Sequence, residues 1–92
     1  MIDISTIIIS DHAIKRFVER GEKMKQSFKD PKQTLIQFLS RSVLAEIDPK
    51  EKVRRIIEHN FEIADYYEYS GWRFVVVKKI LVTVERIKNF QN

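Results

Sequence analysis

The first third of the chain has the hydrophobic pattern of an amphipathic helix. Gly21 fits its end, because glycine adopts the left-handed conformation of a helix terminus at little cost. Ser10 or Asp11 is suited to cap its start, since a short polar side chain accepts a hydrogen bond from an unpaired helix amide. The pattern therefore predicts a helix over residues 11–20. Apolar residues recur at helical spacing at Ala13, Ile14, Phe17 and Val18.

Two further helix starts follow, each an aspartate before a proline. Asp30 caps the first, and Pro31 occupies a position whose amide needs no partner, so a helix is predicted from Pro31 to about Glu46. The same signal at Asp48 predicts a third helix over about 49–59. The polar segment 22–29 is predicted to be a loop or an irregular helix. The buried stripe predicted for the second helix comprises Leu35, Ile36, Leu39 and Val43.

The last third is rich in aromatic and β-branched residues, which favour strands. Strands are predicted over 61–69, 72–77 and 80–87, joined by turns at Ser70-Gly71 and Lys78-Lys79. Strict alternation in the last strand would place Ile80, Val82 and Val84 on one face, and Leu81, Thr83 and Glu85 on the other. The β-branched residues 4–9 predict a short strand or extended segment that can join this sheet.

These elements predict a single α+β domain over 1–92, with N-terminal helices packed on a C-terminal antiparallel sheet of three to four strands. There are no cysteines, which excludes a disulfide scaffold and a thiol nucleophile and fits a reducing compartment. No apolar run approaches the roughly 20 residues that span a bilayer. We therefore expect a cytoplasmic protein with no membrane partner.

The balance of 17 basic against 13 acidic residues gives a net charge of +4. A basic surface favours anionic partners such as nucleic acid, an acidic protein or a lipid surface. Many small domains carry such a charge without binding nucleic acid, so the charge alone does not decide between them.

The polar side of the first predicted helix carries groups suited to RNA cleavage. His12 and Arg16 are i,i+4 neighbours, as are Arg16 and Arg20, so an imidazole and two guanidinium groups form one stripe. RNA transesterification needs a base, an acid and positive charge at the phosphate. Histidine titrates near neutrality, and the arginine fork matches phosphate oxygens. Such a stripe is also compatible with a merely solvated helix face.

The same stretch carries a recognisable motif. It reads His12-Ala13-x-x-Arg16-x-x-Glu19-Arg20-Gly21. This motif resembles the opening of a family of short bacterial and phage-borne proteins with a domain of unknown function. That family is similar to the RelE-like and barnase/EndoU/colicin group of ribonuclease toxins. The ends 73–77 and 81–84 also resemble the family's closing strands, whereas 22–60 is longer and more helical than the family pattern.

The resemblance implies a metal-independent endoribonuclease toxin that cleaves RNA through the 2′-hydroxyl and is held by an acidic antitoxin. His12 would be the general acid or base, with Arg16 on the phosphate beside it. Thr83 would place a hydroxyl near the scissile phosphate. Arg20 and Arg73 would bind RNA from the helix and the sheet. The alternative is a non-catalytic module that uses the same basic surface to bind nucleic acid or protein.

Aromatic and basic residues around the predicted hairpins extend this expectation. Tyr67 is a candidate for stacking on RNA bases, although such rings also serve to cover a small core. Lys78 is a candidate for contacting RNA phosphates. His59 stands beside Asn60 at a predicted helix end, where a capping or solvent role is expected. Two histidines without clustered carboxylates predict no metal site and no cofactor.

Overall fold

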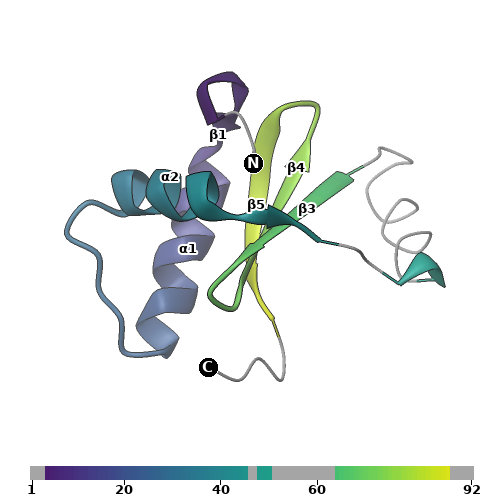
Figure 1. Ribbon diagram of the computed structural model, residues 1–92. Helices are drawn as coiled ribbons and strands as arrows, with labels where there is room; N and C mark the ends of the chain where they lie inside the picture. Colours follow the sequence, from purple (N-terminus) through teal and green to yellow (C-terminus); the bar gives the residue numbers. More distant parts are fainter. Residues whose placement is uncertain (1–3, 46–47, 51–63, 88–92) are drawn as a thin grey trace.

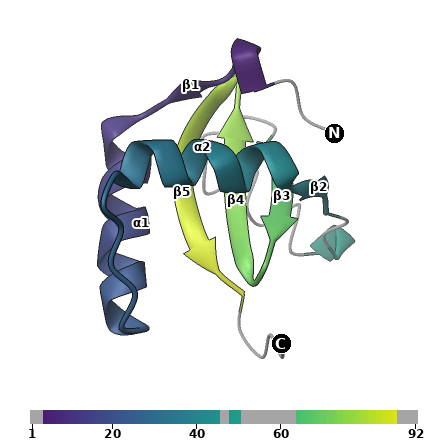
Figure 2. The ribbon, with the colours of Figure 1, turned by 60° about the vertical axis from the view of Figure 1, so that its left-hand side comes forward.

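The computed structural model describes residues 4–45, 48–50 and 64–87. Two helices lie on one face of a five-stranded sheet with the strand order β1-β5-β4-β3-β2 (Figures 1 and 2). This arrangement confirms the predicted α+β class. The elements are η1 (Ile4–Thr6), β1 (Ile8–Ile9), α1 (Asp11–Lys23), α2 (Pro31–Arg41), β2 (Val43–Leu44), β3 (Ala64–Tyr69), β4 (Trp72–Val77) and β5 (Ile80–Arg86).

Helix α1 begins as predicted and ends later. Ser10 is the cap, and its side chain accepts from the amide of Ala13. Gly21 does not end the helix, which continues to Lys23. The termination comes at Lys25, whose φ of 59° is left-handed, while the amide of Gln26 donates back to the carbonyl of Gly21 over 2.8 Å. A lysine therefore occupies the position that glycine usually takes at a helix end.

Helix α2 starts at the predicted cap, where the Asp30 carboxylate accepts from the amide of Gln33. It ends at Arg41 rather than near Glu46. Ser42 is buried in an extended conformation, and its hydroxyl donates to the Leu39 carbonyl. Val43 then lies in β2 with 65% of its surface exposed, so its predicted place in the buried stripe is wrong. Most of the predicted third helix, 49–59, lies outside the described residues.

The meander β3-β4-β5 confirms the predicted order of strands, within the part of 61–87 that the structure describes. Both predicted turns are present, with positive φ at Ser70, Gly71, Lys78 and Lys79. The sheet has more strands than expected, because β2 pairs antiparallel with β3 and β1 pairs parallel with β5. Residues 4–9 divide between η1 and β1 rather than forming one strand.

The strict alternation predicted for β5 is wrong. Thr83 pairs with Val75 and Leu81 pairs with Val76, so Val82 is an extra residue that makes a β-bulge. The bulge returns Leu81 and Val84 to the same side of the sheet, where both are fully buried.

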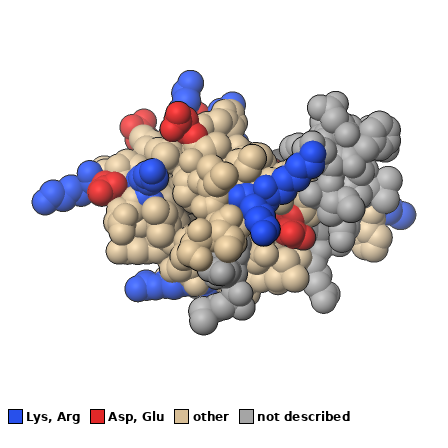
Figure 3. Space-filling view, turned by 90° about the horizontal axis from the view of Figure 1, so that it is seen from above, with Lys and Arg blue, Asp and Glu red and all other residues tan. Residues whose placement is uncertain are grey.

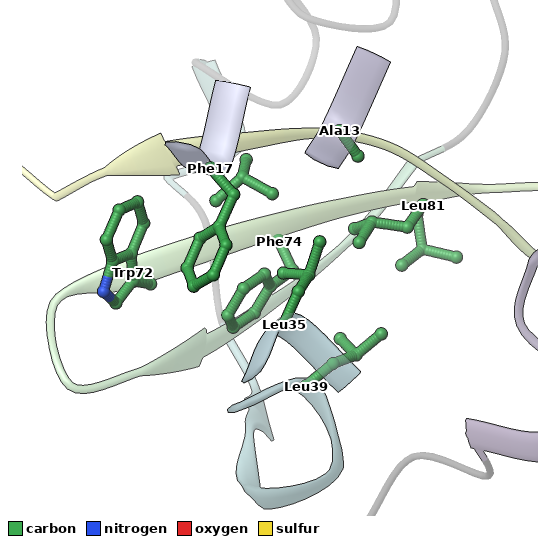
Figure 4. Packing of buried hydrophobic residues seen from close by; sticks show 9 residues of the cluster. Ala13, Phe17, Leu35, Leu39, Trp72, Phe74 and Leu81 are labelled. Carbon is green, nitrogen blue, oxygen red and sulfur yellow. The ribbon is translucent and has the colours of Figure 1, made fainter. Parts of the chain in front are cut away.

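The main core lies between the helices and the sheet face that they cover. Figure 4 shows its side chains converging from α1, α2, β4 and β5. The opposite face carries a second, smaller cluster of buried residues. We call these the helix face and the far face of the sheet. The main core comprises Ala13, Phe17, Leu35, Leu39, Trp72, Phe74, Val76, Leu81 and Val84. The far-face cluster comprises Ala64, Tyr66, Val75 and Val77.

Candidate functional site

The polar side of α1 is bound to strand β5 near both of its ends. At the start of the helix, the Ser10 hydroxyl donates to the Leu81 carbonyl over 2.7 Å. Ten residues later, the Arg20 Nε donates to the Val84 carbonyl over 2.9 Å. Beyond its two-residue pairing with β1, this edge of β5 is therefore covered by α1 instead of by another strand. The bonds set the position of the side chains that lie between them on this helix flank.

His12 and Arg16 occupy that flank and contact each other. The Arg16 Nε lies 3.4 Å from the His12 Nε2, and the imidazole is exposed to solvent. Nε2 is the acceptor in this contact, and the Arg16 Nε is the donor. The predicted i,i+4 pair is thus present at the surface, within reach of a ligand.

Glu19 is part of the same group. Its Oε2 lies 3.2 Å from the Arg16 Nη1, and the two side chains are 43% and 40% exposed for Arg16 and Glu19 respectively. The carboxylate offsets part of the positive charge that Arg16 would offer to a phosphate. The pair follows from the i,i+3 spacing of Arg16 and Glu19 on the helix, which places their side chains next to each other.

Arg20 shares the flank but has a structural bond. Its Nε donates to the backbone carbonyl of Val84, and its two Nη groups take no part in this bond. Arg20 therefore anchors the helix, and only its outer nitrogens are left to meet an anion.

The structure places Arg73 away from this flank. Arg73 lies on the far face of β4, in register with Glu68 of β3 and Glu85 of β5. Its Nε and Nη2 both donate to Glu68 Oε2, over 3.0 and 2.9 Å. Its guanidinium charge is thus balanced by a carboxylate, and the structure does not bring Arg73 together with Arg20, although both were expected to bind RNA.

Thr83 lies on β5, next to the residue that Arg20 contacts. Its register partner is Val75, which is buried in the far-face cluster. Because partners in a sheet point to the same side, the Thr83 side chain belongs to the far face, whereas α1 packs on the helix face. The structure therefore brings His12 and Arg16 together and places Thr83 on the adjoining strand, directed to the opposite face.

Tyr67 is half-buried against the main core on the helix face. Burial raises the pKa of its phenol, and the charge of Asp65 acts in the same direction. The Tyr67 ring therefore covers the core. This is the second of the two roles expected for it from the sequence, the first being to stack on RNA bases. Lys78 is exposed in the β4–β5 turn, at the end of the sheet where β1 and α1 begin.

Among the described residues, no group of three or more histidine, aspartate or glutamate side chains is placed to hold a metal ion. Nor does any helix in that part of the chain have the length and apolarity to cross a bilayer. Comparisons with protein-family models, with curated proteins and with solved structures found no match. The description of the His12–Arg16 site therefore depends on the contacts given above and on no related protein.

Proposed function

We propose that the chain is a metal-independent endoribonuclease of the toxin type, with its catalytic centre at His12 and Arg16. The observation that carries the proposal is the exposed imidazole lying 3.4 Å from a guanidinium, on a helix flank held against β5. An imidazole that can transfer a proton and a guanidinium that can bind phosphate are the two groups that RNA transesterification needs side by side.

In the proposed reaction, His12 removes the proton of a ribose 2′-hydroxyl. The 2′ oxygen forms a bond to phosphorus, the bond from phosphorus to the 5′ oxygen breaks, and the leaving oxygen takes a proton from water. The hydroxide that results takes back the proton held by His12. The products are a 2′,3′-cyclic phosphate and a 5′-hydroxyl. Arg16 binds the phosphoryl oxygens, on which negative charge increases in the transition state. Arg20 positions the helix.

The partners proposed with this activity are RNA and an acidic antitoxin protein. The net charge of +4 favours both, because each is anionic.

The rival function is a basic module that binds nucleic acid without chemistry. Arg16 and Arg73 are both paired with glutamates, which lowers the positive charge available to a transition state and to a bound phosphate alike. Such a module would show salt-dependent RNA binding and no turnover.

The test is an RNA oligonucleotide incubated with the purified chain in EDTA, with products identified by mass. We expect a cyclic phosphate product, and no cleavage when the 2′-hydroxyl at the cleaved position is replaced by hydrogen. His12→Ala and Arg16→Ala should each reduce the rate at least ~100-fold, the scale of a lost acid–base group. Lys15→Ala is the matched control, since Lys15 is exposed on the same helix outside the flank.

Circular dichroism should show that the variants remain folded. Cleavage that persists in both variants would refute the assignment of the centre. Binding without cleavage by the unmodified chain would favour the rival function.

A further inference from the structure

Lysine and arginine side chains do not gather in one patch on the face of the molecule that Figure 3 shows. They lie at separate places on it, and several stand next to aspartate or glutamate side chains. Net charge therefore does not mark a binding surface on this face. The order of cations along a single helix is a more specific signal.

Three cations follow one another along the flank of α1 that lies beside β5 (Figure 2). Arg20 comes four residues after Arg16, and Lys23 comes seven residues after it, so all three return to the same side of the helix. At about 1.5 Å per residue, the steps between them along the helix axis are about 6 Å and about 4.5 Å. We call Arg16, Arg20 and Lys23 the cation row.

Each member of the cation row can reach an anion. Arg16 is 43% exposed beside Glu19, and Lys23 is exposed. The Nη groups of Arg20 take no part in its bond to the backbone of β5. Within the described residues, neither Arg20 nor Lys23 is paired with a carboxylate. The sequence that follows β5 contains no aspartate or glutamate. The row therefore supplies two cations beyond the His12–Arg16 centre.

The steps along the row are close to the spacing of neighbouring phosphates on an extended nucleic acid strand. With the cleaved linkage at Arg16, the next two phosphates on one side would lie beside Arg20 and Lys23, where the flexible stem of the lysine adapts to the shorter step. A row one side chain wide contacts one strand, whereas double-stranded RNA is bound across its grooves. A duplex also holds the 2′ oxygen out of line with the bond that breaks, and alignment is what the reaction needs.

The flank of α1 offers no group that stacks on bases. Besides the His12 imidazole, the only aromatic ring of α1 is that of Phe17, which is fully buried. Contacts to phosphate fix the position of a strand and carry no sequence information. A strand held by the row is therefore selected by its backbone rather than by its bases.

We propose that the substrate is single-stranded RNA bound through its backbone along the cation row, with the cleaved linkage at Arg16 and the next two phosphates at Arg20 and Lys23. This proposal rests on the proposed endoribonuclease activity, because His12 and Arg16 determine which linkage is cleaved. It adds that cleavage depends on two neighbouring linkages on one side and little on the bases.

The probe is a DNA strand of mixed sequence with one ribonucleotide, so that cleavage through a 2′-hydroxyl is possible at one linkage alone. Single linkages on either side are made neutral as methylphosphonates, and kcat/KM is measured with the full chain in EDTA. We expect a loss of about three- to fivefold at the first and at the second linkage on one side, the scale of an exposed ion pair. The third linkage and the linkages on the other side should have little effect.

The variant Lys23→Gln tests the second linkage. In this variant a neutral second linkage should cause no further loss, while a neutral first linkage should still lower kcat/KM. Lys15→Gln is the matched control, because it removes the same charge from an exposed lysine of α1 outside the flank, and it should keep the response to both linkages. A second linkage that still matters in Lys23→Gln would overturn the proposal. So would cleavage of a duplex as fast as of the single strand.

The affinity of the same strand separates this proposal from the activity on which it rests. If the strand is bound and not cleaved, the proposed activity fails, and the row is tested by binding. The slope of log affinity against log salt should then decrease in magnitude by about 0.7 in Lys23→Gln, as expected for one lost phosphate contact, and stay unchanged in Lys15→Gln. Equal slopes in the two variants would overturn the row, as would a strand that is not bound. Tighter binding of a glutamate octapeptide that depends on Lys23 would also overturn it.

Discussion

The Arg20 guanidinium donates its Nε hydrogen to the backbone oxygen of Val84, a residue 64 positions away in the sequence. With the bond from Ser10 to Leu81, it fixes α1 along β5. The polar flank of the helix thus has a defined position relative to the sheet, although its side chains are largely in solvent. The position of His12 and Arg16 depends on these two contacts.

Replacing Arg20 by methionine should therefore destabilise the fold. The substitution keeps the length of the side chain and leaves the Val84 carbonyl without its donor, which is expected to lower the free energy of unfolding by about 1–3 kcal/mol. Urea denaturation measures the change. Lys23→Met, on the same helix and exposed, is the control and should change stability by less than ~0.5 kcal/mol. Equal effects of both variants would show that the Arg20 bond contributes nothing of its own.

Gly21 is a second position on α1 where the packing leaves no room for a larger residue. A Cβ there would lie 2.5 Å from Cε2 of Phe28, whose ring stacks on Phe17 with centroids 4.4 Å apart. Gly21→Ala gains about 1 kcal/mol of helix propensity, but it must displace this ring from a packed core. We expect a net loss of about 1–2 kcal/mol in thermal or urea unfolding. Glu22→Ala is the exposed control, and a stabilised Gly21→Ala protein would show that the ring moves without cost.

The features that the sequence predicts well are local. The cap at Ser10, the i,i+4 pair of His12 and Arg16, and the turn at Ser70-Gly71 each depend on residues within about one helical turn or hairpin. The pairing of Arg73 with Glu68 also follows from that turn, because the two residues are symmetric about it. Extending the register of the predicted hairpin would have identified this pair from the sequence.

The features that it misses depend on distant partners. Val43 follows Leu39 at helical spacing, and only the pairing of β2 with β3 shows that it lies in a strand. The bulge at Val82 has no local signal, since the register of β5 is set by β4. For the same reason, alternation along β5 could not predict on which face of the sheet Thr83 lies relative to α1.

The pair of Arg73 and Glu68 is expected to stabilise the sheet and to be dispensable for RNA. Their side chains are 19% and 32% exposed, so the pair is only partly screened by solvent. Glu68→Gln should lower stability by roughly 0.5–1 kcal/mol, the usual scale for cross-strand pairs. A double-mutant cycle with Arg73→Met measures the coupling. If Arg73→Met lost RNA binding while its stability was unchanged, Arg73 would have to be counted among the RNA-binding residues.

The raised pKa of Tyr67 predicts that the stability of the fold depends on pH in the alkaline range. Burial and Asp65 raise its pKa above the ordinary value of 10.0, so the folded state holds the phenolic proton more firmly than the unfolded state does. The resulting stabilisation is complete below pH 10 and is lost as pH rises through the folded pKa. Denaturation between pH 8 and 11 should therefore show a shallower decline in Tyr67→Phe than in the unmodified chain. Parallel curves would show that the phenol titrates alike in both states.

Glu19 provides the most direct prediction about the proposed centre. Its carboxylate lies 3.2 Å from Arg16 Nη1 at a site that is about two-fifths exposed, so it competes with any phosphate for the guanidinium. Glu19→Gln removes that competition and should tighten RNA binding about two- to fivefold, a gain on the scale of a surface ion pair. The dependence of log affinity on log salt should steepen by about 0.7, as expected for one additional phosphate contact on a single strand. Glu22→Gln makes the same change of charge on the outer side of α1 and is the control. If both variants gain equally, net charge rather than the freed Arg16 is responsible, and Arg16 does not contact the phosphate.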